Sequence, residues 1–304
     1  MIATHLKPMK DVKKILLATD FSSGATAALK QGIRMCERDG TQLELLHVVD
    51  SHGMVDLADA LHQSVEETTK HFEEDARTQL NQWLQNAGVE QSFHVSVVSG
   101  QPLDRILNHI RENEIDLLLL GLTGQEHEGA KDAVGVMANK LIRVSPVRVL
   151  AVNPKQKEDF SHVVACVDFS KNSREVVRQA ILVAELEKSH LSVIHVFNPP
   201  WHRLHYRAPA TGSDVAFQKR FETALTQKLT DFAPIPESIE HDYHLVDASN
   251  CGYGIAEFAR SRGADLIVMG TKGKSNLHYM LAGSTAERVL RELPCSALVV
   301  KPVA

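Results

Sequence analysis

The feature that most limits how this chain can fold is a repeat within its own sequence. The segment Ile15–Ser22 matches Val163–Ser170 at an offset of 148 residues, and both segments contain the triplet Asp-Phe-Ser. Leu46-His47-Val48 matches Ile194-His195-Val196 at the same offset. Each copy is about 150 residues long, the usual size of a unit that folds on its own. The sequence therefore predicts two tandem domains of one fold.

Within each copy, short apolar runs alternate with amphipathic helical stretches. Leu117–Leu120 is apolar at every position, which indicates a strand buried on both faces of a parallel sheet. The predicted class is α/β, with two tandem open parallel five-stranded sheets of Rossmann-like type and helices on both faces. In the first copy we expect strands near 13–19, 43–49, 92–98, 116–121 and 147–152, and helices near 23–38, 56–87, 102–113 and 136–144.

Two further segments complete this outline. The polar segment Asn153–Asp159 sets the boundaries, with an N-terminal domain over 1–152, a linker over 153–159 and a C-terminal domain over 160–304. The charged stretch from Val55 to Ala87 is predicted to be one long solvated amphipathic helix, with a partner-binding face as the alternative.

Composition and charge exclude several functional classes. The 304 residues are 43% hydrophobic and 23% charged, with a formal net charge of −5 and mixed signs, so we expect no nucleic-acid partner. No apolar run approaches the length of a secretory leader or of a membrane span, and we expect a cytoplasmic protein with no membrane partner. The four cysteines are scattered singly and are predicted to be reduced structural thiols.

A glycine-rich loop follows the fourth apolar run of the second copy. Gly270, Gly273 and Gly283 allow positive φ and the close approach of a ligand, and Ser284 opens a predicted helix whose amides can face an anion. Lys272 and Lys274 add positive charge. The loop therefore predicts a site for a nucleotide phosphate. The alternative is a capping box formed by Ser284 and Glu287, which needs no ligand.

These motifs resemble the universal stress proteins, specifically their tandem two-domain form, over nearly the whole chain. Nucleotide-binding members carry G-x2-G-x9-G-S/T after the fourth strand, and the second copy matches this spacing completely. The resemblance implies ATP or a related adenine nucleotide, with Mg²⁺, in the C-terminal domain. By this analogy Asp168 would lie near the ribose and Val196 and Met269 near the base. The residues that it places around the phosphates are Gly270, Gly273, Gly283, Ser284 and Thr285.

The resemblance also implies a function and an assembly. It indicates a sensor or regulatory protein of the stress response, and slow ATP hydrolysis is left open because aligned phosphates with Mg²⁺ need only one water. An enzyme of related architecture would need an H-x-G-H pair or an S-G-G-x-D-S loop, and the second copy has Asp168–Ser173 there instead. Because family members pair through their last strand, the two domains are expected to pack as an intramolecular pseudo-dimer, which would protect both sheet edges. A homodimer of whole chains is left open.

The first copy departs from the phosphate-binding pattern. Ten residues separate Gly124 from Gly135, and Val136 occupies the position of the hydroxyl residue. The loop between Gly121 and Val136 contains three acidic residues and one lysine, a balance that would repel phosphate. We therefore expect the first domain to act as a structural partner. Because Asp20 and Val48 are retained, a ribose-like or uncharged ligand is left open there.

The histidines allow a second interpretation of the C-terminal domain. His47 and His195 lie in apolar strand sequence and are predicted to be structural rings hydrogen-bonded to the backbone. A zinc site could combine His202, His205, His241 and His244 with Asp242, although His241 and His244 would point to opposite faces of a strand. A different small metabolite, or zinc, in the C-terminal cleft is therefore kept as the alternative to a nucleotide.

Overall fold

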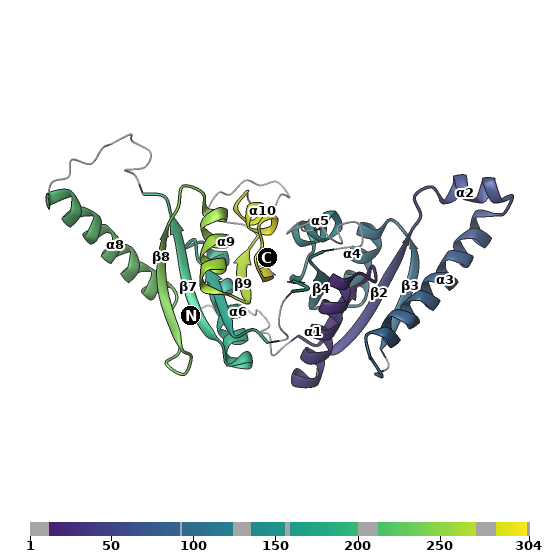
Figure 1. The fold of residues 1–304 in the computed structure, drawn as a ribbon, viewed down its shortest axis with the longest axis horizontal. Coiled ribbons are helices and arrows are strands. Elements are labelled where there is room, and N and C mark those ends of the chain that lie inside the picture. Colours follow the sequence, from purple (N-terminus) through teal and green to yellow (C-terminus); the bar gives the residue numbers. More distant parts are fainter. Residues whose placement is uncertain are drawn as a thin grey trace. The chain divides into compact units, whose positions relative to one another are not determined.

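The computed structural model divides the chain into two compact units, Val12–Pro154 and Lys155–Ala304, which we call the N-terminal and C-terminal units. It describes residues 12–91, 93–123, 135–155, 159–199, 212–271 and 284–302. Each unit is an α/β domain with one parallel sheet (Figure 1), which confirms the predicted fold class.

The N-terminal unit contains five strands in the order β3-β2-β1-β4-β5, and all four neighbouring pairs are parallel. The predicted strand positions are confirmed to within two residues. In chain order the elements are β1 (Lys14–Ala18), α1 (Ser23–Asp39), β2 (Gln42–Asp50), α2 (Met54–Leu61), α3 (Val65–Asn86), β3 (His94–Gly100), α4 (Pro102–Glu112), β4 (Leu117–Gly121), α5 (Val136–Val144) and β5 (Arg148–Val152).

The C-terminal unit repeats this arrangement, with the strand order β10-β9-β6-β7-β8 and parallel pairs throughout. Its elements are β6 (His162–Cys166), α6 (Lys171–Glu187), β7 (His190–Phe197), α8 (Gly212–Phe232), β8 (His241–Asp247), α9 (Cys251–Arg262), β9 (Leu266–Gly270), α10 (Ser284–Arg291) and β10 (Ser296–Val300).

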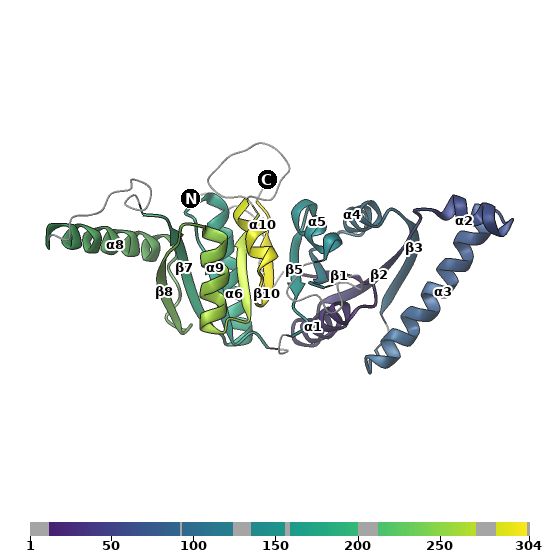
Figure 2. The ribbon, with the colours of Figure 1, turned by 45° about the horizontal axis from the view of Figure 1, so that its top comes forward.

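Helices cover both faces of each sheet. In the N-terminal unit, α1 and α3 share one face, where the Trp83 indole donates a hydrogen bond to Thr26 Oγ1 over 2.9 Å, and α4 and α5 lie on the other face (Figure 2). In the C-terminal unit α9 and α10 lie side by side. The strand β4, which lies between β1 and β5, is consequently buried, and each of its four leucines is at most 4% exposed.

The single long helix predicted at 55–87 is wrong, because the structure contains two helices there. His62 adopts φ of 54° and ends α2, and Ser64 then caps α3. Ser64 and Glu67 form a reciprocal capping box, in which each side chain bonds the backbone amide of the other residue. This Ser-x-x-Glu signature is present in the sequence but lies inside a continuous amphipathic pattern.

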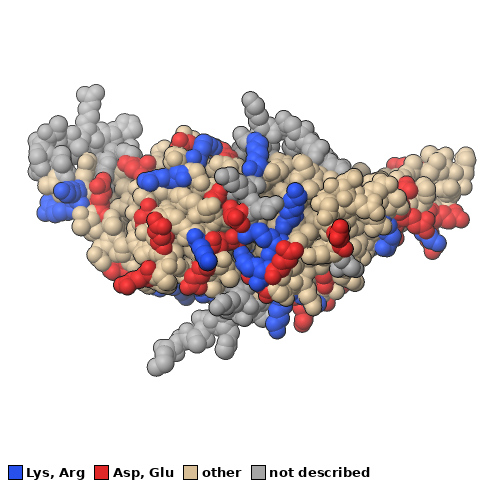
Figure 3. Space-filling view, turned by 60° about the horizontal axis from the view of Figure 1, so that its bottom comes forward, with Lys and Arg blue, Asp and Glu red and all other residues tan. Residues whose placement is uncertain are grey.

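Surface charge on the C-terminal and N-terminal units is mixed in sign. Acidic and basic side chains are interspersed on the face that Figure 3 presents. Within the described residues, no helix is long and apolar enough to cross a membrane.

Candidate functional site

Four of the predicted site residues lie at the carboxyl ends of three neighbouring strands in the C-terminal unit. Asp168 follows β6, Val196 lies near the end of β7, and Met269 and Gly270 end β9. Because β6 pairs with both β7 and β9, these strand ends are adjacent. The carboxyl edge of an open parallel sheet is where such folds bind ligands. Met269 is 3% exposed, so its side chain belongs to the core of the unit.

Asp168 is held by two serines that follow it. The amide of Ser170 donates to Asp168 Oδ1 over 2.9 Å, and the Ser173 hydroxyl donates to the same oxygen. In return, the amide of Asp168 donates to Ser173 Oγ over 3.0 Å. The carboxylate therefore has a fixed orientation at the end of β6. Ser173, the third residue of α6, is not among the predicted site residues.

Phe169, which follows this aspartate, has a backbone conformation that is rare for a large side chain. Its φ is 62°, and Phe21 at the matching position of the first copy has φ of 64°. Each ring packs on the histidine of the neighbouring strand, with centroid distances of 4.4 Å from Phe169 to His195 and 4.3 Å from Phe21 to His47. This contact offsets the cost of the left-handed backbone, which is about 1–2 kcal/mol.

The same two histidines bond the backbone, as predicted. His195 Nδ1 lies 2.7 Å from the carbonyl oxygen of Val167, and His47 Nδ1 lies 2.8 Å from that of Thr19. Burial lowers the pKa of His47, which favours its neutral ring. Because a carbonyl can only accept, the Nδ1 atom carries the proton in both rings. The structural interpretation of His47 and His195 is confirmed.

The remaining predicted phosphate-binding residues are described in part. Lys272, Gly273, Lys274 and Gly283 lie outside the described residues, and so do the side chains of Ser284 and Thr285. Ser284 is the first described residue of α10, and the residues before it lie outside the described part of the chain, so the capping-box alternative stays open. The matching helix α5 likewise begins at Val136, after Gly135 as its N-cap.

Gly121, the counterpart of Gly270 in the first copy, has a packing role in the N-terminal unit. Gly121 ends β4, and a Cβ atom there would lie 2.6 Å from the backbone nitrogen of Ala25 at the start of α1. Gly121 is therefore needed for the strand to approach the helix, whether or not a phosphate binds. Gly270 occupies the matching place in the extended backbone of β9. That glycine alone is weak evidence for nucleotide binding.

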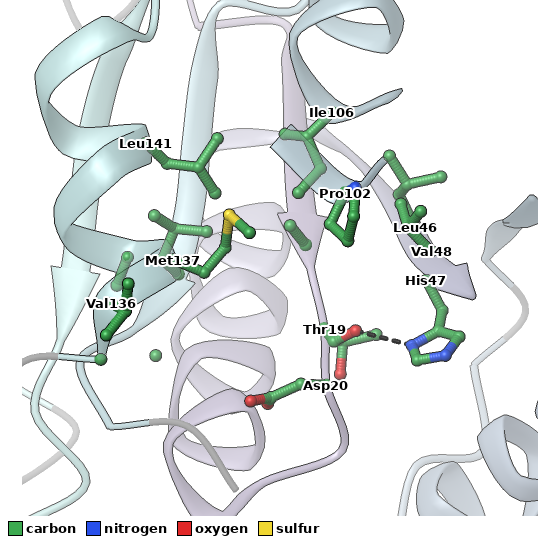
Figure 4. Close-up of a pocket in the computed structure, with 15 residues that line it drawn as sticks. Thr19, Asp20, Leu46, His47, Val48, Pro102, Ile106, Val136, Met137 and Leu141 are labelled. Atoms are coloured by element: carbon green, nitrogen blue, oxygen red, sulfur yellow. Dashed lines mark hydrogen bonds between the residues drawn. The ribbon is translucent and has the colours of Figure 1, made fainter. Parts of the chain in front are cut away.

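A cavity of about 440 Å³ lies in the N-terminal unit, where the sequence analysis expected a structural partner. It opens among the carboxyl ends of β1, β2 and β4 and the first turns of α4 and α5 (Figure 4). Asp20 and Val48, the counterparts of Asp168 and Val196, both line it. The first copy therefore retains a ligand-sized space at the edge where this fold binds ligands.

The histidines of β8 do not form a metal site with other described residues. His241 and His244 make separate contacts, as the alternation of the strand predicts: His241 Nδ1 lies 2.8 Å from the Ile239 carbonyl, and His244 Nε2 lies 2.7 Å from Asp242 Oδ2. Within the part of the chain that the structure describes, no group of three or more potential ligands could hold a metal ion. His202 and His205 lie outside that part.

Asp242 instead anchors a polar network at the opposite end of the sheet from Asp168. The Ser192 hydroxyl donates to Asp242 Oδ1 over 2.7 Å, and His190 Nε2 lies 3.3 Å from the same oxygen. His162 Nε2 lies 2.8 Å from Ser192 Oγ. Burial by itself would raise the pKa of Asp242, but the bonds from Ser192, His244 and His190 outweigh it and lower the pKa to about 2.

Both units are thus open parallel α/β domains of one type, each with an aspartate and a valine at the edge where such sheets bind ligands. The model of the Universal stress protein family matches residues 11–153 and again residues 159–301. The chain belongs to the universal stress protein family and contains two tandem domains of it.

Individual relatives agree with this assignment. The chain is 23% identical to the Universal stress protein E homolog of Haemophilus influenzae, over 95% of this chain and 97% of that protein. A stretch of 47 residues is 57% identical to Universal stress protein MJ0531 of Methanocaldococcus jannaschii and covers 16% of this chain and 28% of that one. The crystal structure of a putative universal stress protein from Pseudomonas aeruginosa has the same fold, with a TM-score of 0.62, 20% identity and coverage of 97% of this chain and 95% of that one.

Proposed function

We propose that the C-terminal unit binds ATP, or a related adenine nucleotide, and that the protein acts in the stress response as a nucleotide-dependent sensor or regulatory partner. The observation that carries this proposal is the fixed orientation of Asp168 at the end of β6, beside the ends of β7 and β9. A carboxylate held in this way is ready to accept hydrogen bonds from ribose hydroxyls. Asp168 is partly buried, so such bonds would be shielded from water.

The base and the phosphates have separate supports. Val196 lies one strand away from Asp168, and a Cβ atom at Gly254 would lie 2.9 Å from Val196 Cγ1, so α9 packs closely behind that residue. For the phosphates, the support is the sequence between β9 and α10, which contains three spaced glycines and two lysines. The amides at the start of α10 would add to this positive potential.

The nucleotide would bring Mg²⁺ with its phosphates, because Mg²⁺ in such sites is held largely by phosphate oxygens and water. The ion would neutralise phosphate charge and would polarise the terminal phosphate. Asp168 and Val196 would bind and orient the nucleoside part. We assign no general base among the described residues, so hydrolysis, if measured, should be slow.

Binding stoichiometry tests the proposal. Nucleotide-free protein should bind one ATP per chain in calorimetry, and protein purified without added nucleotide should release up to one adenine nucleotide per chain when it is denatured. Gly273→Val should abolish binding, because the side chain would exclude the phosphates. Gly124→Val at the matching position of the first copy is the control and should leave binding unchanged.

Two results would overturn the proposal. One is an equal ATP site in each unit, and the other is unchanged ATP affinity in a correctly folded Gly273→Val variant. Release of zinc or of another metabolite in place of a nucleotide would favour the alternative ligand class.

A further inference from the structure

The cavity of the N-terminal unit is lined mainly by apolar side chains. Figure 4 shows Leu141, Met137, Ile106 and Pro102 on one side of the space and Thr19, Asp20 and His47 on the other. The volume of about 440 Å³ is within the range of small-molecule sites, which are usually apolar with a few placed polar groups. The cavity therefore has an apolar end and a polar end, and it can hold a ring system together with a hydroxylated group.

The polar end presents acceptors to a ligand. Asp20 is exposed, and its Oδ1 atom accepts a hydrogen bond from the Ser22 amide over 3.1 Å, which orients the carboxylate. The His47 ring is directed by its bond to the Thr19 carbonyl, and burial favours its neutral form. An ionised carboxylate can only accept hydrogen bonds. The group that meets it should therefore be a donor such as a hydroxyl.

The charge at this site disfavours an anionic ligand. Among the described residues that line the cavity, none is a lysine or an arginine, and the one charged group is Asp20. The helix that borders it begins with Val136 and Met137, where α10 begins with Ser284 and Thr285. A phosphate at this position would meet two apolar side chains where the second copy has two hydroxyl residues, and each of these two substitutions removes a hydrogen-bond partner for it.

A cationic ligand is also disfavoured. A cation would lose hydration water at the apolar end, and its attraction to a single exposed carboxylate is too weak to offset that desolvation penalty. An apolar space with an acceptor at its rim, and with no basic side chain among the described lining residues, favours a neutral molecule.

We propose that the N-terminal unit holds a second ligand site, which takes an uncharged, hydroxylated ring compound of nucleoside size and rejects its phosphorylated forms. Its ring would occupy the space among Ile106, Met137 and Leu141, and its hydroxyls would donate to Asp20. The proposal concerns a different unit from the ATP site and does not depend on it. The two copies would then differ in charge preference although they share one fold.

Calorimetry with adenosine and AMP tests this site, because the two probes differ by one phosphate. The experiment uses the full chain carrying Gly273→Val, which removes phosphate-dependent binding at the proposed ATP site, and the α5 variants described next assign the adenosine signal to this cavity. Adenosine should bind this cavity, and AMP should bind it at least about tenfold more weakly. Absence of adenosine binding up to millimolar concentration, or equal binding of AMP, would overturn the proposal.

Two exposed valines on α5 allow a test of whether adenosine binds in this cavity. Val136 lines the cavity and is 55% exposed, whereas Val144 is 41% exposed at the other end of the same helix. Val136→Trp should block the cavity and weaken adenosine binding at least about tenfold, and Val144→Trp should leave it unchanged. Both positions are exposed, so neither change should unfold the unit. Equal adenosine affinity in the two variants would exclude this cavity as the site.

Asp20→Asn tests the role of charge. Asparagine keeps the Oδ1 acceptor for the Ser22 amide and removes the negative charge. AMP affinity should therefore rise at least about threefold relative to adenosine. An unchanged ratio would show that the carboxylate does not set the preference of the site for uncharged ligands.

Discussion

Ser173 holds Asp168 through two hydrogen bonds, one in each direction: its hydroxyl donates to the carboxylate, and its oxygen accepts from the aspartate amide over 3.0 Å. The matching residue of the first copy is Ala25, so Asp20 has no equivalent hydroxyl there. The two aspartates thus share a position in the fold but differ in how they are oriented.

Removal of this hydroxyl should weaken nucleotide binding. We expect Ser173→Ala to lower ATP affinity by roughly three- to tenfold, since an unfixed carboxylate must be ordered on binding. The free energy of unfolding should fall by about 1 kcal/mol through the lost hydrogen bonds. Calorimetry and urea unfolding measure the two effects. Ala25→Ser, at the matching position, should leave ATP affinity unchanged; a reduction there equal to that of Ser173→Ala would argue against a C-terminal site.

Ser284→Ala should separate ligand binding from helix capping. Because the proposal assigns the Ser284 hydroxyl to the phosphates and not to a helix cap, the change should alter the free energy of unfolding by less than about 0.5 kcal/mol. ATP affinity should fall, because a hydroxyl next to the proposed phosphates is lost. Val136→Ala at the matching position is the control. A stability loss of about 1 kcal/mol with unchanged affinity would restore the capping interpretation.

The ends of α1 and α6 provide a matched test of backbone conformation. Gly40 and Lys188 both follow their helices with positive φ, at 69° and 54°. Lys188→Gly should raise the free energy of unfolding of the C-terminal unit by about 1 kcal/mol, because glycine adopts this conformation without a Cβ penalty. Gly40→Lys should lower that of the N-terminal unit by a similar amount. Thermal unfolding measures both, and shifts of the same sign would contradict the explanation.

The Asp242 network should make the C-terminal unit sensitive to acid. Its folded-state pKa of about 2 is below the ordinary value of 3.8, so its contribution to stability is present above pH 4 and is lost as the pH falls toward 2. Burial also lowers the pKa of His162, so protonation of that ring below pH 6.5 acts in the same direction.

Asp242→Asn should therefore reduce the dependence of unfolding free energy on pH between 4 and 2. At pH 7 the variant should lose on the order of 1 kcal/mol, because solvent screens this partly exposed side chain. Urea unfolding at several pH values gives the profile. Glu237→Gln, at an exposed position before β8, is the control. A profile for Asp242→Asn that matches the unmodified protein would remove the network as the cause.

The two-domain α/β fold could be predicted because each strand and helix is marked by a short sequence pattern, and the same series of patterns occurs in both copies. Apolar runs such as Leu117–Leu120 mark buried strands, and their recurrence in the second copy fixes the element order. The break between α2 and α3 was missed because the capping box of Ser64 lies within a continuous amphipathic pattern. The repeated Asp-Phe-Ser turn indicated a shared geometry, but neither the left-handed backbone of Phe169 nor the bonds of Ser173 could be deduced from it.

The cavity could not be predicted for a different reason. Its lining comes from three strands and two helices that are far apart in the sequence, and its volume depends on how the side chains of Leu46, Ile106 and Met137 pack. The loss of the phosphate pattern in the first copy indicated a structural domain, and the retained Asp20 and Val48 left a ribose-like or uncharged ligand open. Neither observation indicated the volume or the lining of the space.

Trp83, whose indole joins α3 to α1, can serve as an intrinsic fluorescence probe of the N-terminal unit. Trp83 is 8% exposed, and its ring centroid lies 5.8 Å from that of Phe21, which in turn stacks on His47 at the edge of the cavity. The chain has two tryptophans, so Trp201→Phe would leave Trp83 as the single emitter. Its fluorescence would then record occupancy of the cavity in solution, with no added label.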